Sequence, residues 1–482
     1  MKFKFYLLFF TISFCLNAQP PSKFYARVGG DGYDVGYDVK QTLDKGYIIT
    51  GSTSSYGLGN TDMYLLKLDS MGQIKFQSTF GNVKNDIGKS VIQLMDSSYV
   101  VLGYTNSIGF GGYDIFLVKA NKYGGLVWQK TIGGISWDFA HSIQQTLDGG
   151  FIIAGSTYDS KYGNSDGYVI KTDANGNVIW NKIFGGANDD EFKSVIQTAD
   201  GGYALAGNTN SYGDLNGDTW VFKLLANGDS AWSTKYGGIK EDFGNKVYQL
   251  QNSEIVVVGG TKSVSTNGAT ETIILKYDAT VGTLTYSYAD LSTIDEYYNS
   301  FAEGLNGLLV GCGKTKDPFF GFQGLVDMYT STFGYFKFFP FTFGNNDELF
   351  SIYKTKDKGF VCVGTTQGGS AVLQDVLILK MDSLGNYGNN ITSIQDHDLN
   401  NIGLTIFPNP ASNTLNLKLD NVSKLSQPNF KIVNIEGNTM MMDIITNNKT
   451  EIQIQNLASG LYFLQLYDHY NLIKTSKISI IK

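Results

Sequence analysis

Six aspartates stand at equivalent places in successive copies of a repeated segment, and they are the most regular chemistry-bearing residues of the chain. They are Asp34, Asp86, Asp138, Asp190, Asp242 and Asp347. Carboxylates gathered around one axis could hold a cation or bind amines. An aspartate repeated once per unit can instead accept backbone N–H bonds in a turn. We expect the structural role first and keep the six as candidate ligand-binding residues.

Three tyrosines in long polar loops form a second candidate set, Tyr56, Tyr162 and Tyr212. Aromatic side chains present flat apolar faces that suit sugar rings and the centres of protein interfaces. Packing within the loop is the alternative role for each of them. We predict that any ligand contacts the loops that carry these residues.

Residues for covalent catalysis or for a metal site are scarce. The chain has only three histidines, His141, His397 and His469, and no evident pairing of a nucleophile with a base. No segment has the ligand density of a strong calcium loop. We therefore predict no catalytic residue, no metal and no cofactor, although a carboxylate-pair glycosidase remains an alternative because acids are plentiful.

A period of about 52 residues organises the chain. A glycine ends an apolar strand pattern in seven copies, at Gly51, Gly103, Gly155, Gly207, Gly259, Gly311 and Gly364. A Gln ten residues before it, an Asp eleven after it and a Lys sixteen after it keep the same register in most copies, as at Gln41, Asp62 and Lys67. Fixed periods of this length are typical of propellers and solenoids.

Within one copy the apolar residues alternate with period two, which predicts strands. In the third copy we expect strands at 140–145, 151–155, 166–172 and 178–184, joined by Asp-Gly and Asn-Gly turns. Four antiparallel strands in about 50 residues make a propeller blade. The first-to-second and third-to-fourth strand turns are short and share one face, whereas the longer loops share the other, where a ligand site is expected.

The two ends of the array predict a closed ring of seven blades. Residues 23–30 look like an isolated fourth strand, and the seventh copy lacks its own fourth strand because residues 383–401 are polar. Pairing of the two segments would remove both exposed sheet edges. The sixth copy is the weakest, with Phe301 and Phe322 at the Gln and Asp positions.

The N-terminal residues 1–18 read as a secretory signal peptide, with Lys2 and Lys4 before an apolar run. Lipidation at Cys15 is a weaker alternative, because bulky Phe14 precedes it. Without Lys2 and Lys4 the net charge changes from −7 to −9, which argues against nucleic acid as a partner. No later segment is apolar enough to predict a membrane span, and Cys312 and Cys362 are expected to be buried free thiols.

The last 80 residues form a separate unit in which short alternating runs predict about seven strands, as in a small β-sandwich. Phe407-Pro408-Asn409-Pro410, Asn434-Ile435-Glu436-Gly437 and Leu457-Ala458-Ser459-Gly460-Leu461-Tyr462 follow each other in order. This set resembles the type A sorting domain of type IX secretion cargo. The resemblance implies passage across the outer membrane of a Bacteroidetes-type cell, removal of the tail by a sortase-like peptidase, and release or surface attachment. A small carbohydrate-binding or adhesive sandwich is the alternative for this tail.

The propeller repeats, clearest at 197–203, resemble uncharacterised repeats of secreted bacterial propellers, which implies fold rather than activity. We therefore predict an all-β chain: signal peptide 1–18, seven-bladed propeller 19–382, linker 383–401 and sorting domain 402–482. The expected function is a secreted or surface-attached, non-enzymatic binding or adhesion protein for a glycan or protein. The alternative is a polysaccharide-acting enzyme, glycosidase or lyase, with two acids converging in a deep pocket.

Overall fold

The computed structural model describes residues 23–159, 164–290, 292, 294–304, 307–317, 321–330, 334–341, 345–367, 373–387, 403–420, 428–434, 439–468 and 471–482. Within these ranges the regular structure is β-strand, and no α-helix is formed. The predicted signal peptide, most of the linker and Tyr162 lie outside the described residues. The all-β class expected from the period-two patterns is confirmed.

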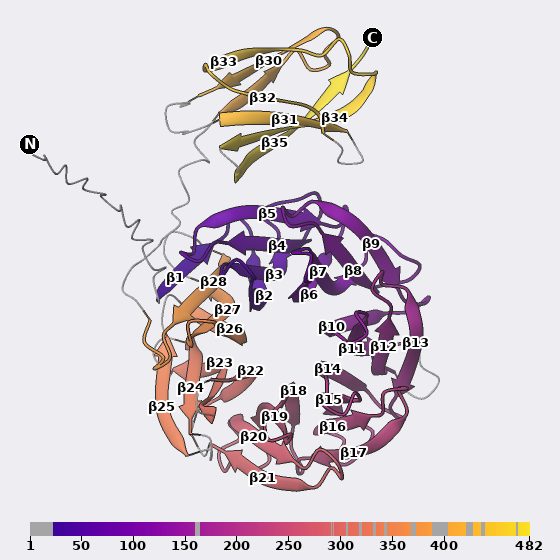
Figure 1. The fold of residues 1–482 in the computed structure, drawn as a ribbon, viewed down its shortest axis with the longest axis vertical. Coiled ribbons are helices and arrows are strands. Elements are labelled where there is room, and N and C mark those ends of the chain that lie inside the picture. The colour runs from indigo at the N-terminus through magenta and orange to yellow at the C-terminus, as the bar shows by residue number, and fades with distance from the viewer. Residues whose placement is uncertain are drawn as a thin grey trace, which may run out of the picture.

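Residues 24–381 form seven four-stranded antiparallel sheets arranged as blades around a central opening (Figure 1). We call the four strands of each blade a to d, from the opening outward. The first four blades are β2 (Asp34–Gln41), β3 (Tyr47–Thr53), β4 (Asp62–Leu68), β5 (Ile74–Phe80); β6 (Asp86–Gln93), β7 (Tyr99–Thr105), β8 (Asp114–Ala120), β9 (Leu126–Ile132); β10 (Asp138–Gln145), β11 (Phe151–Thr157), β12 (Asp166–Thr172), β13 (Val178–Phe184); β14 (Asp190–Gln197), β15 (Tyr203–Thr209), β16 (Asp218–Leu224), β17 (Ser230–Tyr236).

The last three blades are β18 (Asp242–Gln249), β19 (Ile255–Thr261), β20 (Glu271–Tyr277), β21 (Leu284–Ala289); β22 (Glu296–Glu303), β23 (Leu309–Asp317), β24 (Gly321–Tyr329), β25 (Tyr335–Phe341); and β26 (Asn345–Lys354), β27 (Phe360–Gln367), β28 (Gln374–Met381) with β1 (Phe24–Val28). The predicted strands c and d of the third blade agree with β12 and β13, and strands a and b extend two residues further toward the long loops.

The N-terminal strand β1 completes the seventh blade, as predicted. It pairs antiparallel with β28, from Phe24 opposite Lys380 to Val28 opposite Val376. Arg27 adds an ion pair to Asp375, with Nε 2.5 Å from the carboxylate Oδ2. First and last strands of the array therefore share one sheet, and the ring has no free edge at this point.

Two of the repeated residue types join turns and strands, one within a blade and one between neighbouring blades. The buried Lys171 donates to the Thr172 carbonyl at 2.9 Å and pairs with Asp148 of the turn between strands a and b at 2.9 Å. Gln197 accepts a hydrogen bond from the backbone N–H of Leu147 in the preceding blade at 2.8 Å. Strands b and c are almost fully buried, so apolar faces of neighbouring blades pack into continuous clusters between them.

The repeat register in the sixth blade differs from the sequence prediction. Gly313, not Gly311, pairs with strand a at the position that Gly51 occupies in the first blade. The fifth blade has one extra residue between β19 and β20 and another between β20 and β21, and together they displace the next copy by two residues. The corrected register puts Gln323 rather than Phe322 at the Asp position, and Glu303 rather than Phe301 at the Gln position.

The C-terminal unit has two packed sheets. Their strands are β29 (Leu404–Phe407), β30 (Thr414–Leu419) and β33 (Lys449–Gln453) in one sheet, and β32 (Thr439–Ile444), β31 (Pro428–Asn434), β34 (Gly460–Asp468) and β35 (Asn471–Ile480) in the other. Leu417, Ile432 and Leu464 belong to the apolar core that both sheets share. The predicted small sandwich is therefore present.

Candidate functional site

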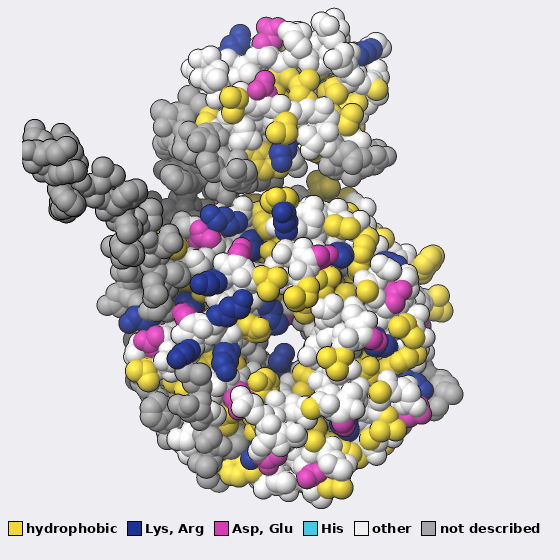
Figure 2. Space-filling view, in the orientation of Figure 1, with side chains coloured by type: hydrophobic (Ala, Val, Ile, Leu, Met, Phe, Trp, Pro, Cys, Tyr) yellow, Lys and Arg dark blue, Asp and Glu magenta, His cyan; other side chains and the backbone are white. Residues whose placement is uncertain are grey.

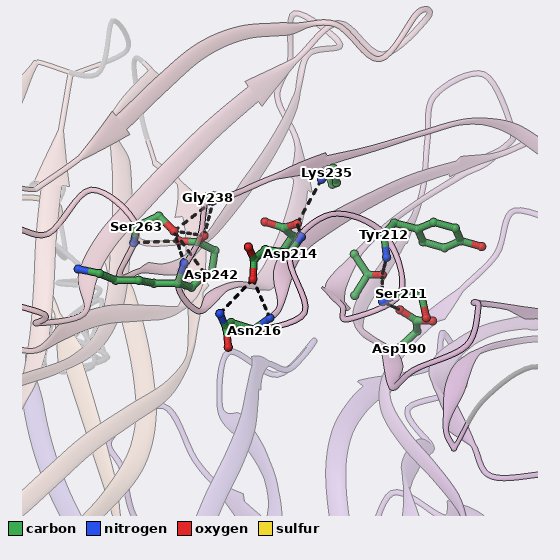
Figure 3. A network of polar contacts seen from close by, with 12 residues as sticks. Asp190, Ser211, Tyr212, Asp214, Asn216, Lys235, Gly238, Asp242 and Ser263 are labelled. Carbon is green, nitrogen blue, oxygen red and sulfur yellow. Dashed lines mark hydrogen bonds and ion pairs between the residues drawn. The ribbon is translucent and has the colours of Figure 1, made fainter.

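The six repeated aspartates each begin, or nearly begin, a strand a beneath the loop that precedes it. Asp242 accepts hydrogen bonds from the Gly238 N–H at 2.9 Å and the Ser263 hydroxyl at 2.6 Å (Figure 3). Asp190 likewise accepts the N–H of Gly186 at 2.9 Å. None of the six is more than 1% exposed. The carboxylates therefore organise the loops between blades, and a role in ligand contact stays a prediction.

A seventh acid at the same position was missed by the sequence prediction. Glu296 begins strand a of the sixth blade and accepts a hydrogen bond from the Thr315 hydroxyl at 2.6 Å. The equivalent hydroxyl in the fifth blade, Thr261, donates to Asp242. The two-residue displacement of the sixth copy hid this acid, and a search that allowed Glu as well as Asp could have found it.

A second carboxylate lies at the start of strand c. In the third blade this residue is Asp166, and it lies near Asp190, the first residue of strand a in the fourth blade. A Cβ built on Gly185 would lie 1.7 Å from Asp166 Oδ1 and 2.8 Å from Asp190 Oδ2, so a glycine is required between them. Burial, together with the nearby charge of Asp190, raises the pKa of Asp166 to about 6. At the next junction Lys235 lies 3.4 Å from Asp218 and supplies a positive charge (Figure 3).

The tyrosines predicted as contacts join adjacent blades. Tyr212 donates its hydroxyl hydrogen bond to the Gly185 carbonyl at 2.7 Å, and Tyr56 does the same to Gly29 at 2.8 Å. Both side chains remain partly exposed. Tyr212 also lines a cavity of about 460 Å³ on the rim between the third and fourth blades, with Trp220 and Phe222. Tyr162 lies outside the described residues.

A larger aromatic cluster lies on the loop face of the second and third blades. Tyr104, Tyr113, Trp137, Phe139 and Tyr158 contact one another edge to face or tilted, with ring centroids 5.0–6.4 Å apart. Trp137 is 50% exposed and Tyr158 is 40% exposed, so two ring systems face solvent. We call Trp137 and Tyr158 the aromatic platform.

The backbone fixes the platform in place. Tyr158 donates its N–H to the Trp137 carbonyl at 2.8 Å, which joins the loop after β11 to the loop before β10. A Cβ on Gly112 would lie 1.8 Å from the Trp137 ring, so only a glycine permits this close approach from the second blade. Three separate loops thus hold the platform.

A polar cavity of about 420 Å³ adjoins the platform and opens toward strands a of the third and fourth blades. Phe139, His141, Ser156, Tyr158, Ser165, Asp189, Asp190, Glu191, Asn208 and Asn210 line it. Asn208 donates to Glu191 at 3.0 Å, and His141 lies 3.7 Å from the same carboxylate. Amide, hydroxyl and carboxylate groups beside exposed aromatic rings form a mixed surface that can both stack and hydrogen-bond.

The ionisation states of Glu191 and His141 set the charge of this cavity. Burial opposes the ionised form of Glu191, but Lys193 and His141 outweigh it and hold the pKa of Glu191 below its usual value. Burial lowers the pKa of His141 to about 4 despite Glu191. At neutral pH the pair is a carboxylate beside a neutral imidazole, which can orient hydroxyl groups.

The platform was not found from sequence because neither residue belongs to the repeat register. The loop Ile135-Ser136-Trp137 occupies the place of Ala187-Asn188-Asp189 in the next blade, and its two large apolar residues were the available signal. In the part of the chain that the structure describes, no group of three or more His, Cys, Asp and Glu side chains could hold a metal ion. Cys312 and Cys362 are buried and free, as predicted.

Residues 405–482 match the family described as secretion system C-terminal sorting domain. No curated protein matches the chain. Among solved structures, a fungal alcohol oxidase of the AA5 family shares 12% identity over 95% of this chain and 98% of its own, with a TM-score of 0.44.

PorZ, a surface component of the type IX secretion system of Porphyromonas gingivalis, shares 10% identity over 94% of this chain and 75% of its own, with a TM-score of 0.35. A puromycin hydrolase shares 11% identity over 81% of this chain and 62% of its own, with a TM-score of 0.49. Likenesses this distant carry no argument about activity.

The fold and the tail together define a class: a β-propeller protein carrying a secretion tag. The C-terminal sorting domain marks the chain as cargo of the type IX secretion system, exported to the cell surface or the extracellular space. Among the described residues, no helix is long and apolar enough to cross a membrane.

Proposed function

We propose that the exported propeller is a non-enzymatic binding protein whose loop face takes a glycan at the aromatic platform and the adjoining polar cavity. The observation that carries the proposal is the pairing of half-exposed Trp137 and Tyr158 with Asn208 and Glu191. Sugar rings combine apolar C–H faces with hydroxyl edges, and this surface offers a partner for each.

The enzyme alternative predicts two acids that converge on one bond in a deep pocket. Asp190 is buried and already accepts a backbone N–H, and Asp189 accepts hydrogen bonds from Ser165. The neighbouring charge of Lys193 helps to keep Glu191 ionised, which does not suit a general acid. These contacts support the binding role.

The sorting domain directs export of the propeller to the cell surface or the extracellular space, where it would bind its ligand. We infer that a sortase-like peptidase removes residues from about 402 onward and leaves the propeller released or attached at the surface. This step separates the binding unit from its export signal.

Replacing Trp137 by Ala tests the binding proposal. We expect the purified mature propeller to bind a subset of a glycan array and Trp137→Ala to lose at least about tenfold in affinity, because one stacking face disappears. Tyr123→Ala is the matched control, since Tyr123 is 74% exposed on the opposite face. Equal binding by both variants would place the ligand elsewhere, and hydrolysis of a bound glycan would favour the enzyme alternative.

A further inference from the structure

The face opposite the loops carries exposed apolar side chains at the tips of its turns. The turns between strands a and b, and between c and d, all emerge on this face, which we call the turn face. Met95 is 86% exposed and Leu147 is 88% exposed, although turn tips are ordinarily polar. The exposed apolar tips are Leu43, Met71, Met95, Tyr123, Leu147, Leu225, Val281 and Leu384.

A cluster of lysines lies among these turns, at the junction of the first and seventh blades where the ring closes. Lys40 and Lys45 come from the first blade, and Lys354, Lys356 and Lys358 come from the seventh. We call these five residues the lysine cluster. In Figure 2 basic side chains gather beside the central opening over the strands of the seventh blade.

One glutamine joins the two turns that carry the cluster. Gln41 accepts a hydrogen bond from the Lys356 N–H at 2.7 Å and donates one to the Lys45 carbonyl at 3.2 Å. The two turns therefore lie side by side. Lys40 also lies over the ring of Tyr353, 5.5 Å from its centroid, across the same junction.

Nearby carboxylates neutralise Lys40 but not the three exposed lysines at the turn tips. Asp44 pairs with the buried Lys67 at 3.0 Å, and Asp357 pairs with the buried Lys380 at 2.9 Å. Asp38 lies 2.6 Å from Lys40. No carboxylate of the described chain lies within ion-pair distance of Lys45, Lys356 or Lys358, which are all exposed. The chain as a whole has a net charge of −7, so this cluster is a local exception.

Two of these lysines occupy a backbone conformation that favours glycine. Lys45 has φ 67° and Lys358 has φ 74°, where the third and fourth blades have Gly149 and Gly201 at φ 84° and 82°. An L-residue there costs free energy that glycine avoids. Stability alone therefore favours glycine over lysine at both turn tips.

We propose that the turn face docks on the anionic, phosphate-bearing outer surface of a membrane. The lysine cluster contacts phosphate groups, and apolar tips such as Met95 and Leu147 enter the interfacial layer. Charge complementarity selects this orientation, since the rest of the acidic chain is repelled by the same surface. Docking leaves the loop face pointing away from the membrane, and the inference is independent of the function proposed for that face.

Co-sedimentation with vesicles tests the docking. The mature chain is mixed with phosphatidylcholine vesicles, with vesicles that also contain phosphatidylglycerol, and with soluble polyphosphate. We expect binding to the anionic vesicles that weakens as salt is raised, little binding to neutral vesicles, and weakening by about a hundredfold in Lys45→Glu/Lys356→Glu/Lys358→Glu. Lys84→Glu/Lys240→Glu/Lys262→Glu carries the same charge change on the loop side and should retain most of the binding.

The apolar tips separate a membrane from a free polyanion. Met95→Ser/Leu147→Ser should weaken vesicle binding and leave polyphosphate binding unchanged. If the two triple lysine variants lose the same affinity for anionic vesicles, the lysine cluster is not the contact surface. If Met95→Ser/Leu147→Ser binds vesicles as tightly as the wild type, the proposed membrane docking is wrong, and the lysine cluster binds a soluble polyanion instead. Unchanged thermal midpoints of the variants establish that each is folded.

Discussion

The carboxyl group of Asp327 makes the propeller lose stability as pH rises. Asp327 lies in strand c of the sixth blade, is 3% exposed, and stands where other blades have Leu66, Val118 or Ile170. Tyr298 donates to its Oδ2 at 2.6 Å, whereas Oδ1 is buried without a hydrogen-bond partner among the described residues. Burial raises the pKa of Asp327 to about 7.

The size of this loss of stability follows from the difference between the pKa of Asp327 in the folded and in the unfolded chain. The unfolded chain loses this proton near pH 4, while the folded propeller keeps it up to about pH 7, so the free energy of unfolding falls across this window. A difference of roughly three pKa units is worth about 4 kcal/mol. With an unfolding entropy of about 2 cal/mol/K per residue, a propeller of this size would shift its thermal midpoint by roughly 5 °C.

Asp327→Asn removes the titration and retains an oxygen acceptor for Tyr298. Thermal unfolding followed by circular dichroism at pH 4.5 and pH 8.5 should show that the variant loses about 3 kcal/mol less than the wild type between the two values, because part of the window lies below pH 4.5. Asp31→Asn, in an exposed turn, should leave the pH dependence unchanged. An Asp327→Asn variant with the full wild-type pH dependence would refute the reasoning.

Two further substitutions address the repeat glycine and the closing blade. Gly155→Ala should destabilise the propeller by about 3 kcal/mol or more, because the new Cβ would lie 1.8 Å from the Phe139 carbonyl oxygen. Gly149→Ala, with open space but φ 84°, should cost only about 1 kcal/mol in the same urea titration, and equal costs would contradict this account. Arg27→Met should cost about 2 kcal/mol and speed amide exchange in β1, because it leaves Asp375 without this cation. Lys182→Met breaks an exposed ion pair and should cost less than about 1 kcal/mol, so similar exchange in both variants would argue against a closing role for Arg27.

The ring of blades could be predicted from the sequence because each repeated residue makes a local contact that explains why it recurs. The glycine opposite strand a has no room for a Cβ, the lysine reaches a carbonyl and a turn carboxylate, and the Gln joins neighbouring turns. Such constraints recur wherever the same packing recurs. Small insertions between strands cost little, and two of them in the fifth blade were enough to mislead the register at Gly311.

The candidate site was less predictable for the opposite reason. Trp137 and Tyr158 occur once, on loops whose lengths and sequences are free to vary, so no second copy marks them. Their proximity depends on a hydrogen bond between two loops and on the absence of a side chain at Gly112. Pairwise spacing along the chain does not encode that arrangement.

The pairing of β1 with β28 also has a consequence for chains that are not completed. A chain truncated before the seventh blade cannot close its ring, and it also lacks the sorting domain that begins near residue 405. Any chain that is long enough to carry the sorting domain therefore also contains both strands that close the ring.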